Sequence, residues 1–125
     1  MSRLTGMILV VDDEEIVREV CSEMVASFGL HVLTASDGQE AVEVFSQNAE
    51  RISCVILDLT MPKIDGMTAF REIVRITPDA KVILSSGYDE KESLQRLSGP
   101  GLAGFIQKPY TLEKLYSVLV NAIYT

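Results

Sequence analysis

The sequence predicts an α/β fold in which a parallel β-sheet is covered by helices on both faces. Five short apolar runs alternate along the chain with stretches whose apolar residues recur at helical spacing. Connections of that length suit right-handed crossovers between parallel strands and are too long for hairpins. Because parallel strands end along one edge of their sheet, the polar residues that follow them are expected to meet there.

The run 7–11 is the first predicted strand because its five residues are all apolar. A helix is expected to begin at about Glu14 and to end just before Gly29, since glycine commonly follows a helix C-terminus. Apolar residues at i, i+1, i+4 and i+5 define its expected inner face: Ile16, Val17, Val20, Cys21, Met24, Val25 and Phe28. Residues 1–6 have no apolar segment of the signal-peptide kind and are expected to be a flexible leader before one domain over 7–125.

Runs of the same kind predict the remaining strands at 31–35, 54–58, 81–85 and 104–107. The third strand is expected to be buried on both faces, because Cys54, Val55, Ile56 and Leu57 are consecutive apolar residues. Asp37 and Glu40 precede the second helix with the spacing of a capping box.

The third helix is expected to end near Ile76, and the fifth begins near Thr111. Their apolar faces comprise Met67, Phe70, Ile73 and Val74 in one, and Leu112, Leu115, Leu119, Ala122 and Ile123 in the other. A short fourth helix over about 90–97 has only Leu94 and Leu97 as clearly apolar residues. It is therefore expected to be mobile or to face a partner.

Composition limits the function classes. The chain has 125 residues, of which 47% are hydrophobic and 23% are charged, and these values fit one soluble domain. A net charge of −7 argues against binding to nucleic acid or anionic lipid. No apolar run approaches the roughly 20 residues that span a bilayer, so a cytoplasmic location is expected. Cys21 and Cys54 are interpreted as small core residues.

Several polar residues follow strands of the predicted sheet and are expected to converge: Asp12, Asp13, Asp58, Ser85 or Ser86, and Lys108. Three carboxylates in one cleft repel one another, and a divalent cation together with one lysine removes that repulsion. An all-oxygen ligand set of carboxylates suits Mg²⁺, or Mn²⁺, rather than zinc.

The other groups at this edge suit a phosphoryl group. Lys108 supplies a positive charge, a serine supplies a hydroxyl, and Gly87 supplies an amide that a ligand can approach closely. The cluster contains no histidine base and no cysteine nucleophile. A carboxylate is then the natural nucleophile, and Asp58 is preferred because it lies on the central strand.

From about Met7 to Tyr124 the chain resembles the receiver domains of two-component response regulators. The motifs that carry the resemblance are Val10-Val11-Asp12-Asp13-Glu14, Leu57-Asp58-Leu59-Thr60-Met61-Pro62 followed by Asp65-Gly66, Ser86-Gly87, and Lys108-Pro109. Each motif alone is weak, whereas all four in order at strand ends are specific. The resemblance implies a flavodoxin-like fold with strand order 2-1-3-4-5 and five flanking helices.

The resemblance implies that Asp58 accepts a phosphoryl group from a phosphohistidine. It assigns Mg²⁺ to Asp13, to Asp58 and to the backbone carbonyl of Thr60, with Asp12 acting through a water molecule. Lys108 pairs with the phosphoryl oxygens, and the peptide bond to Pro109 is usually cis.

It further implies a conformational switch. Ser86 is the hydroxyl that moves toward the phosphoryl group, with the Gly87 amide beside it. Phe105 takes the aromatic switch position, where tyrosine is common. The face formed by the fourth helix, fifth strand and fifth helix then changes and is also a possible homodimer interface. Ser85 is the alternative switch residue, although the neighbouring Gly87 favours Ser86.

The implied activity is that of a signalling phosphoacceptor, not of an enzyme with a separate substrate, although the domain assists its own Mg²⁺-dependent phosphorylation and dephosphorylation. The implied partner is a histidine kinase or a histidine phosphotransfer protein. The stretch 101–110 resembles receivers at the C-terminus of hybrid sensor histidine kinases. The chain is therefore expected to be a single-domain regulator or the receiver of a hybrid kinase, whose full-length form would be a histidine kinase.

Three alternatives remain open. A phosphatase of the haloacid-dehalogenase type requires a second aspartate two residues after the nucleophile, where this chain has Thr60. A flavin carrier is disfavoured because the acidic edge would repel a flavin phosphate. A pseudo-receiver that only binds partners is disfavoured because the acid, lysine and serine set is complete. Each residue also has a structural explanation, such as Asp12 and Asp13 capping the first helix, but these explanations do not account for the shared edge.

Overall fold

The computed structural model describes residues 2–59, 66–87 and 102–124. Its core is one five-stranded parallel sheet with the strand order β2-β1-β3-β4-β5, which confirms the predicted order. The strands are β1 (Met7–Val11), β2 (His31–Ala35), β3 (Ile52–Asp58), β4 (Val82–Ser86) and β5 (Leu102–Gln107). Each lies within two residues of its predicted bounds.

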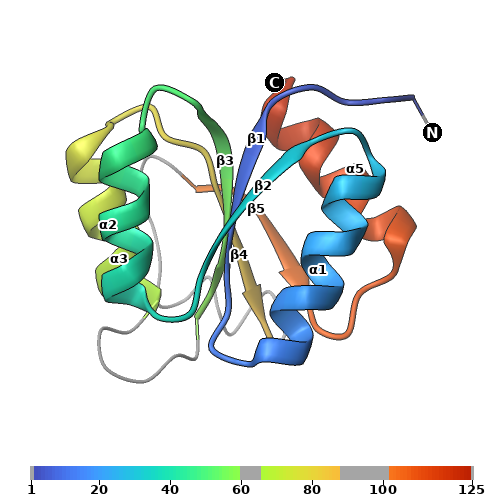
Figure 1. Ribbon diagram of the computed structural model, residues 1–125, viewed down its shortest axis with the longest axis horizontal. Helices are drawn as coiled ribbons and strands as arrows, with labels where there is room; N and C mark the ends of the chain where they lie inside the picture. The colour runs from blue at the N-terminus through green and yellow to red at the C-terminus, as the bar shows by residue number, and fades with distance from the viewer. Residues whose placement is uncertain (1, 60–65, 88–101, 125) are drawn as a thin grey trace.

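Helices cover both faces of the sheet, with α1 and α5 on one side and α2 and α3 on the other (Figure 1). The helices are α1 (Glu15–Ser27), α2 (Gly38–Asn48), α3 (Gly66–Ile76) and α5 (Leu112–Ile123). The helix predicted over about 90–97 lies outside the described residues. Among the helices that the structure describes, none is both long enough and apolar enough to cross a bilayer.

The central strands are buried on both faces, as their unbroken apolar runs predict. Alternate residues of each strand contribute to two separate cores. The core under α2 and α3 includes Leu9, Val11, Val55, Leu57, Leu84, Phe45 and Ile73. The core under α1 and α5 includes Ile8, Val10, Cys54, Ile56, Ile83, Ile106, Cys21 and Leu115. Both cysteines are buried and free, as predicted for core residues.

Side chains cap two of the helices. Asp37 caps α2 as predicted, because it accepts from the Glu40 amide at 2.7 Å. Glu40 Oε1 accepts from the Ser36 amide at 3.0 Å, one residue before the N-cap amide that a capping box would use. Thr111 caps α5 by accepting from the Lys114 amide at 3.1 Å. These caps fix where the helices begin.

The N-terminal segment departs from the flexible leader that was expected over residues 1–6. Leu4 is 3% exposed and belongs to the core under α1 and α5. Its amide donates to the Phe28 carbonyl at 2.7 Å, and the Tyr116 hydroxyl donates to the Ser2 carbonyl at 2.7 Å. A single buried leucine has no periodicity, so the sequence contains no local signal for this packing.

The inner face expected for α1 is only partly correct. Cys21 and Val25 are buried, but Ile16 is 75% exposed and Val20 is 45% exposed. The physical reason is the width of the apolar stripe. At 3.6 residues per turn, Ile16 lies about 140° around the helix from Cys21, beyond the arc that reaches the sheet. Two aliphatic side chains of α1 are therefore left on the surface.

Candidate functional site

The topology brings three charged residues to the carboxyl edge of the sheet. Asp12 follows β1, Asp58 ends β3, and Lys108 follows β5. Strands β1 and β3 are adjacent, and β4 lies between β3 and β5. The Lys108 side chain therefore reaches back across β4 toward residues that lie up to 96 positions away in the sequence.

The three predicted metal-ligating aspartates lie together. One carboxylate oxygen of each of Asp12, Asp13 and Asp58 lies within 4.8 Å of the others. Asp58 is 1% exposed and Asp12 is 4% exposed, whereas Asp13 faces solvent. Like charges this close and this buried raise the free energy of the folded chain unless a cation compensates them.

Lys108 supplies part of that compensation. Its Nζ atom donates to Asp12 Oδ2 at 2.7 Å and lies 3.4 Å from Asp58 Oδ2. Burial acts to lower the pKa of Lys108, but the hydrogen bond to Asp12 and the charge of Asp58 outweigh it, so the pKa lies above its ordinary value. The ammonium group is therefore charged at neutral pH. One ammonium among three carboxylates leaves two negative charges, which matches a divalent cation bound by oxygen ligands.

Asp12 also has a structural role in the turn before α1. Its Oδ1 atom accepts from the Glu14 amide at 3.0 Å, and its backbone carbonyl accepts from Arg18 Nη1 at 2.9 Å. Glu14 is itself the N-cap residue of α1 and no side-chain hydrogen bond caps this helix, so Asp12 is not the helix cap that its position suggested. The hydrogen bond to Glu14 leaves the second oxygen of Asp12, Oδ2, to accept from Lys108.

The backbone around Lys108 is tied to β4. The Lys108 amide donates to the Ser86 carbonyl at 2.8 Å, and the peptide bond between Lys108 and Pro109 is cis, as the resemblance implies. The hydrogen bond to Ser86 holds the chain after β5 at the end of β4, and the Lys108 side chain extends over the end of the sheet to Asp12 and Asp58.

The two serines at the end of β4 face opposite sides of the sheet. Ser86 alternates with Ser85 and shares a face with Leu84, which pairs with Phe105 in register. Phe105 is partly buried against the core under α2 and α3. Ser86 and Phe105 therefore lie on the same face of adjacent strands, while Ser85 lies on the face of Asp58. Both serines are buried.

Two glycines at this edge differ in what surrounds them. A Cβ atom on Gly66 would lie 2.4 Å from the Asp58 carbonyl oxygen and 2.7 Å from Leu59 Cα, so the start of α3 packs directly on the end of β3. A Cβ atom on Gly87 would meet nothing within 4 Å among the described residues. Among the described residues, a larger side chain is therefore sterically excluded at position 66 but not at position 87. The sequence marked Gly66 only as part of a motif.

Tyr110 also lies beside the charged cluster, close enough for the charges of Asp12 and Asp58 to affect it. Its hydroxyl lies close enough to the Cys21 thiol for the two groups to affect each other's pKa. Burial raises the pKa of Tyr110, and the charges of Asp12 and Asp58 act in the same direction. This contact joins α1 to the segment after Lys108, and only the folded chain reveals it.

Some predicted residues lie outside the described part of the chain. Thr60, assigned to the metal through its carbonyl, falls in the segment 60–65, and Leu94 and Leu97 fall in 88–101. Of the predicted site residues that the structure describes, Asp12, Asp13, Asp58 and Lys108 lie together, and Ser85, Ser86, Gly87 and Phe105 lie on or next to the neighbouring strands β4 and β5.

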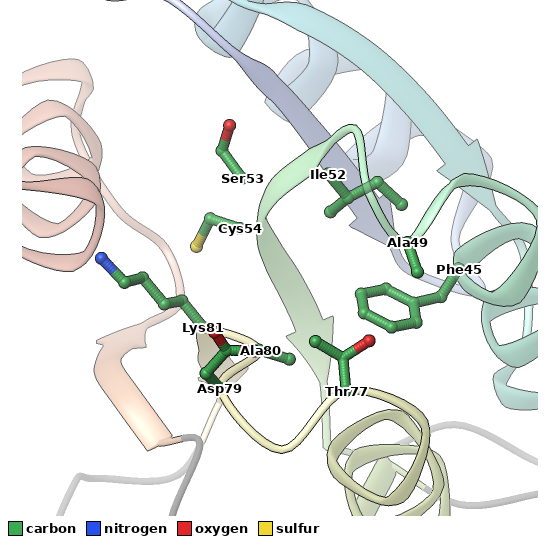
Figure 2. A pocket seen from close by; sticks show the side chains of 9 residues that line it. All are labelled: Phe45, Ala49, Ile52, Ser53, Cys54, Thr77, Asp79, Ala80 and Lys81. Atoms are coloured by element: carbon green, nitrogen blue, oxygen red, sulfur yellow. The ribbon is translucent and has the colours of Figure 1, made fainter.

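A pocket of about 190 Å³ lies at the opposite, amino edge of the sheet. Figure 2 shows Phe45 and Thr77 on one side of it and Lys81 extending away on the other. It is smaller than the roughly 300 Å³ at which small-molecule sites begin, and none of the clustered aspartates lines it. The pocket is therefore separate from the charged site.

Comparison with known proteins gives a consistent result. Residues 8–120 match the family model of the response regulator receiver domain. The sensor kinase CckA of Brucella abortus is 35% identical over 111 residues, which cover 89% of this chain and 12% of that protein. The chemotaxis protein CheY of Treponema pallidum is 34% identical over 117 residues, which cover 90% of this chain and 81% of that protein.

One similar solved structure is the CheX-CheY-BeF3-Mg complex of Borrelia burgdorferi. It superposes with a TM-score of 0.80 at 31% identity and covers 92% of this chain and 87% of that chain. The 125-residue chain thus spans most of a CheY protein but about an eighth of the sensor kinase.

Proposed function

Because this chain belongs to the response regulator receiver domain family of two-component systems, we propose that Asp58 is the side chain that accepts a phosphoryl group from a phosphohistidine. The observation that carries the proposal is the burial of Asp58 beside Lys108, Asp12 and Asp13. A carboxylate in such a place is costly for folding and is well placed for chemistry.

In the proposed reaction an oxygen of Asp58 attacks phosphorus in line with the leaving imidazole nitrogen. The new P–O bond forms as the P–N bond breaks, and the bonding electron pair leaves with the imidazole. The ammonium of Lys108, which lies 3.4 Å from Asp58 Oδ2, moves onto the phosphoryl oxygens. Asp12 keeps Lys108 charged and holds it beside Asp58 before the transfer.

Mg²⁺ is the cofactor that we assign to the aspartate cluster. Three carboxylates with two uncompensated negative charges fit an oxygen-ligated divalent cation. When bound, Mg²⁺ would neutralise the phosphoryl oxygens and lower the repulsion between them and the aspartates. The proposal agrees with the similar CheY of Borrelia burgdorferi, whose solved complex contains BeF3 and Mg.

Phosphorylation then acts through the opposite face of the sheet. Ser86 and Phe105 lie on the same face of β4 and β5, so a displacement of Ser86 toward the phosphoryl group opens space into which Phe105 can turn. The surface of β5 and α5 carries the change, and a homodimer through this surface is a proposed output. Amide exchange that slows in β5 and α5 upon phosphorylation is the expected result, and unchanged exchange there would remove the switch from the proposal.

The phosphodonor partner is proposed to dock on α1. Ile16 and Val20 are exposed aliphatic residues on the helix that begins just after Asp12 and Asp13. A histidine kinase or histidine phosphotransfer protein that covers them would place its phosphohistidine near Asp58. Ile16→Lys should slow transfer from such a protein and leave labelling by acetyl phosphate unaltered, because the small donor needs no docking surface.

The proposed function is tested by incubation with acetyl phosphate and Mg²⁺, followed by intact-mass measurement. The parent should gain the mass of one phosphoryl group, and Asp58→Asn should not. Asp37→Asn is the matched control, since Asp37 is a partly exposed helix cap and asparagine caps equally well. Labelling of Asp58→Asn at the parent rate would overturn the proposal. Repeated turnover of p-nitrophenyl phosphate would instead support the phosphatase alternative.

The relation to a longer protein is also a proposal. The chain covers 12% of the length of the sensor kinase CckA and 81% of that of a CheY. Both a single-domain regulator and the receiver of a hybrid histidine kinase agree with these proportions. Sequencing the complete gene decides between them.

A further inference from the structure

Ser85 is the residue that lies directly beside Asp58 in the sheet. The two are register partners in the parallel pair of β3 and β4. Side chains of register partners lie on the same face. That face is the one toward α1 and α5, because Ile83, two residues before Ser85, and Ile56, two residues before Asp58, both belong to the core there.

Ser85 is also flanked from the other side by the strand that leads to Lys108. It pairs with Ile106 of β5, which belongs to the same core and precedes Lys108 by two residues. The lysine side chain must cross β4 to reach Asp12 and Asp58. Ser85 therefore lies on β4, between the strand that carries Asp58 and the strand that leads to Lys108, the two partners of the ion pair.

The Ser85 hydroxyl has no hydrogen-bond partner among the residues that the structure describes, although Ser85 is only 2% exposed. An unpaired hydroxyl on a buried strand is unfavourable for folding. The residues before Ser85 on β4 are all aliphatic, so an aliphatic residue would also suit this position. Folding alone does not explain a hydroxyl at position 85.

We propose that Ser85 is a positioning residue for Asp58, and this inference rests on the proposed function. A serine hydroxyl rotates freely and can donate to a neighbouring carboxylate. As the Lys108 ammonium moves from Asp58 to the phosphoryl oxygens, the Ser85 hydroxyl donates to the carboxylate oxygen of Asp58 that does not attack. The attacking oxygen then keeps its direction while its ion-pair partner is engaged elsewhere.

The test compares Ser85→Thr with Ser85→Val, which have the same shape but differ in the hydroxyl. Each is labelled with a series of acetyl phosphate concentrations in excess Mg²⁺, and the rate is followed by intact mass. Ser85→Val should have a maximal rate about tenfold below that of the parent, the factor expected for one lost hydrogen bond, with the half-saturating concentration unchanged. Ser85→Thr should stay within about twofold of the parent.

Ser85→Ala separates size from chemistry. It keeps room for the Lys108 side chain but lacks the hydroxyl, so it should be as slow as Ser85→Val. Equal rates for the valine and threonine variants, or a parent rate for the alanine variant, would overturn the inference and leave the proposed function intact. A parent protein that takes up no label would overturn the proposed function, and this inference with it.

Discussion

The two edges of the sheet use polar residues in opposite ways. At the amino edge, Lys81 Nζ donates to the Ile123 carbonyl at 3.1 Å, near the end of α5, and Ser53 Oγ accepts from the Met7 amide at 3.4 Å. These contacts complete backbone hydrogen bonding where helices and strands end. At the carboxyl edge, three carboxylates lie together and one ammonium, that of Lys108, pairs with two of them, Asp12 and Asp58. The contrast indicates that polar groups serve folding at one edge and chemistry at the other.

The largest expected effect, a change in the labelling rate, comes from replacing the lysine at each edge with methionine. Lys108→Met should lower the rate of labelling by acetyl phosphate on the order of 100-fold, because a positioned cation at the developing charge is lost. Lys81→Met should leave the labelling rate unchanged and lower the free energy of unfolding by about 1 kcal/mol, because one contact to a helix carbonyl is lost. Rates and denaturant curves for both variants measure this. Equal labelling rates for the two variants would contradict the view that only the lysine at the carboxyl edge takes part in phosphorylation.

A second pair of variants sharpens the comparison within the carboxyl edge. Gly66→Ala should destabilise the protein by roughly 3 kcal/mol, because its Cβ atom would press on the Asp58 carbonyl and on Leu59. Gly87→Ala should change the free energy of unfolding by less than about 0.5 kcal/mol, because Gly87 is exposed and an added Cβ atom would meet no described residue within 4 Å. Urea unfolding of both proteins provides the measurement. A tolerant Gly66 would mean that α3 does not pack on the end of β3.

Metal should stabilise the carboxyl edge alone. Mg²⁺ at about 100 times its dissociation constant should raise the free energy of unfolding by about 2.7 kcal/mol, since it binds only the folded aspartate cluster. Asp13→Asn should reduce this gain and, without metal, should slightly stabilise the fold by removing one repelling charge. Asp79→Asn at the amino-edge pocket is the control and should retain the full gain. Thermal melts with Mg²⁺ and with EDTA give both quantities, and equal gains in the two variants would contradict the assignment.

The smallest effect concerns the buried thiols. Burial raises the pKa of Cys54 from 9.0 to about 12 and that of Cys21 from 9.0 to about 11. An acid whose pKa is raised by folding contributes stability that is fully present below its unfolded pKa and is lost as pH rises through the folded pKa. The loss should therefore begin near pH 9. Between pH 8.5 and 10 it should amount to about 1 kcal/mol per thiol.

Cys54→Ala isolates this contribution, because Lys108 and Tyr110 also have raised pKa values and titrate in the alkaline range. The variant should be less stable than the parent at pH 8 but should lose less stability between pH 8.5 and 10. Urea unfolding at the two pH values provides the comparison. Identical pH slopes would show that the thiol is not buried as described.

The sequence was sufficient wherever a local pattern determined the outcome. The run 7–11 defines β1, and Asp37 with Glu40 defines the start of α2. Asp12, Asp58 and Lys108 were also expected to meet, because parallel topology places strand ends along one edge. The fold and the charged members of the site could thus be predicted without coordinates.

Features that depend on tertiary packing were not predictable in the same way. Periodicity predicted that Ile16 and Val20 belong to the apolar face of α1. It could not show that the buried part of that face is too narrow to include them. The burial of Leu4 and the contact of Tyr110 with Cys21 join segments that have no shared pattern. Only the strand register shows that Ser85, and not Ser86, lies on the same face of the sheet as Asp58. From the sequence alone the two consecutive serines are equivalent.

The most direct measurement is to locate the phosphoryl group. The protein is labelled with acetyl phosphate and Mg²⁺ and reduced with borohydride, which converts an aspartyl phosphate to homoserine, and its peptides are then sequenced by mass spectrometry. We predict homoserine at position 58 and at no other aspartate. Homoserine at position 12 or 13, with Asp58 intact, would contradict the account.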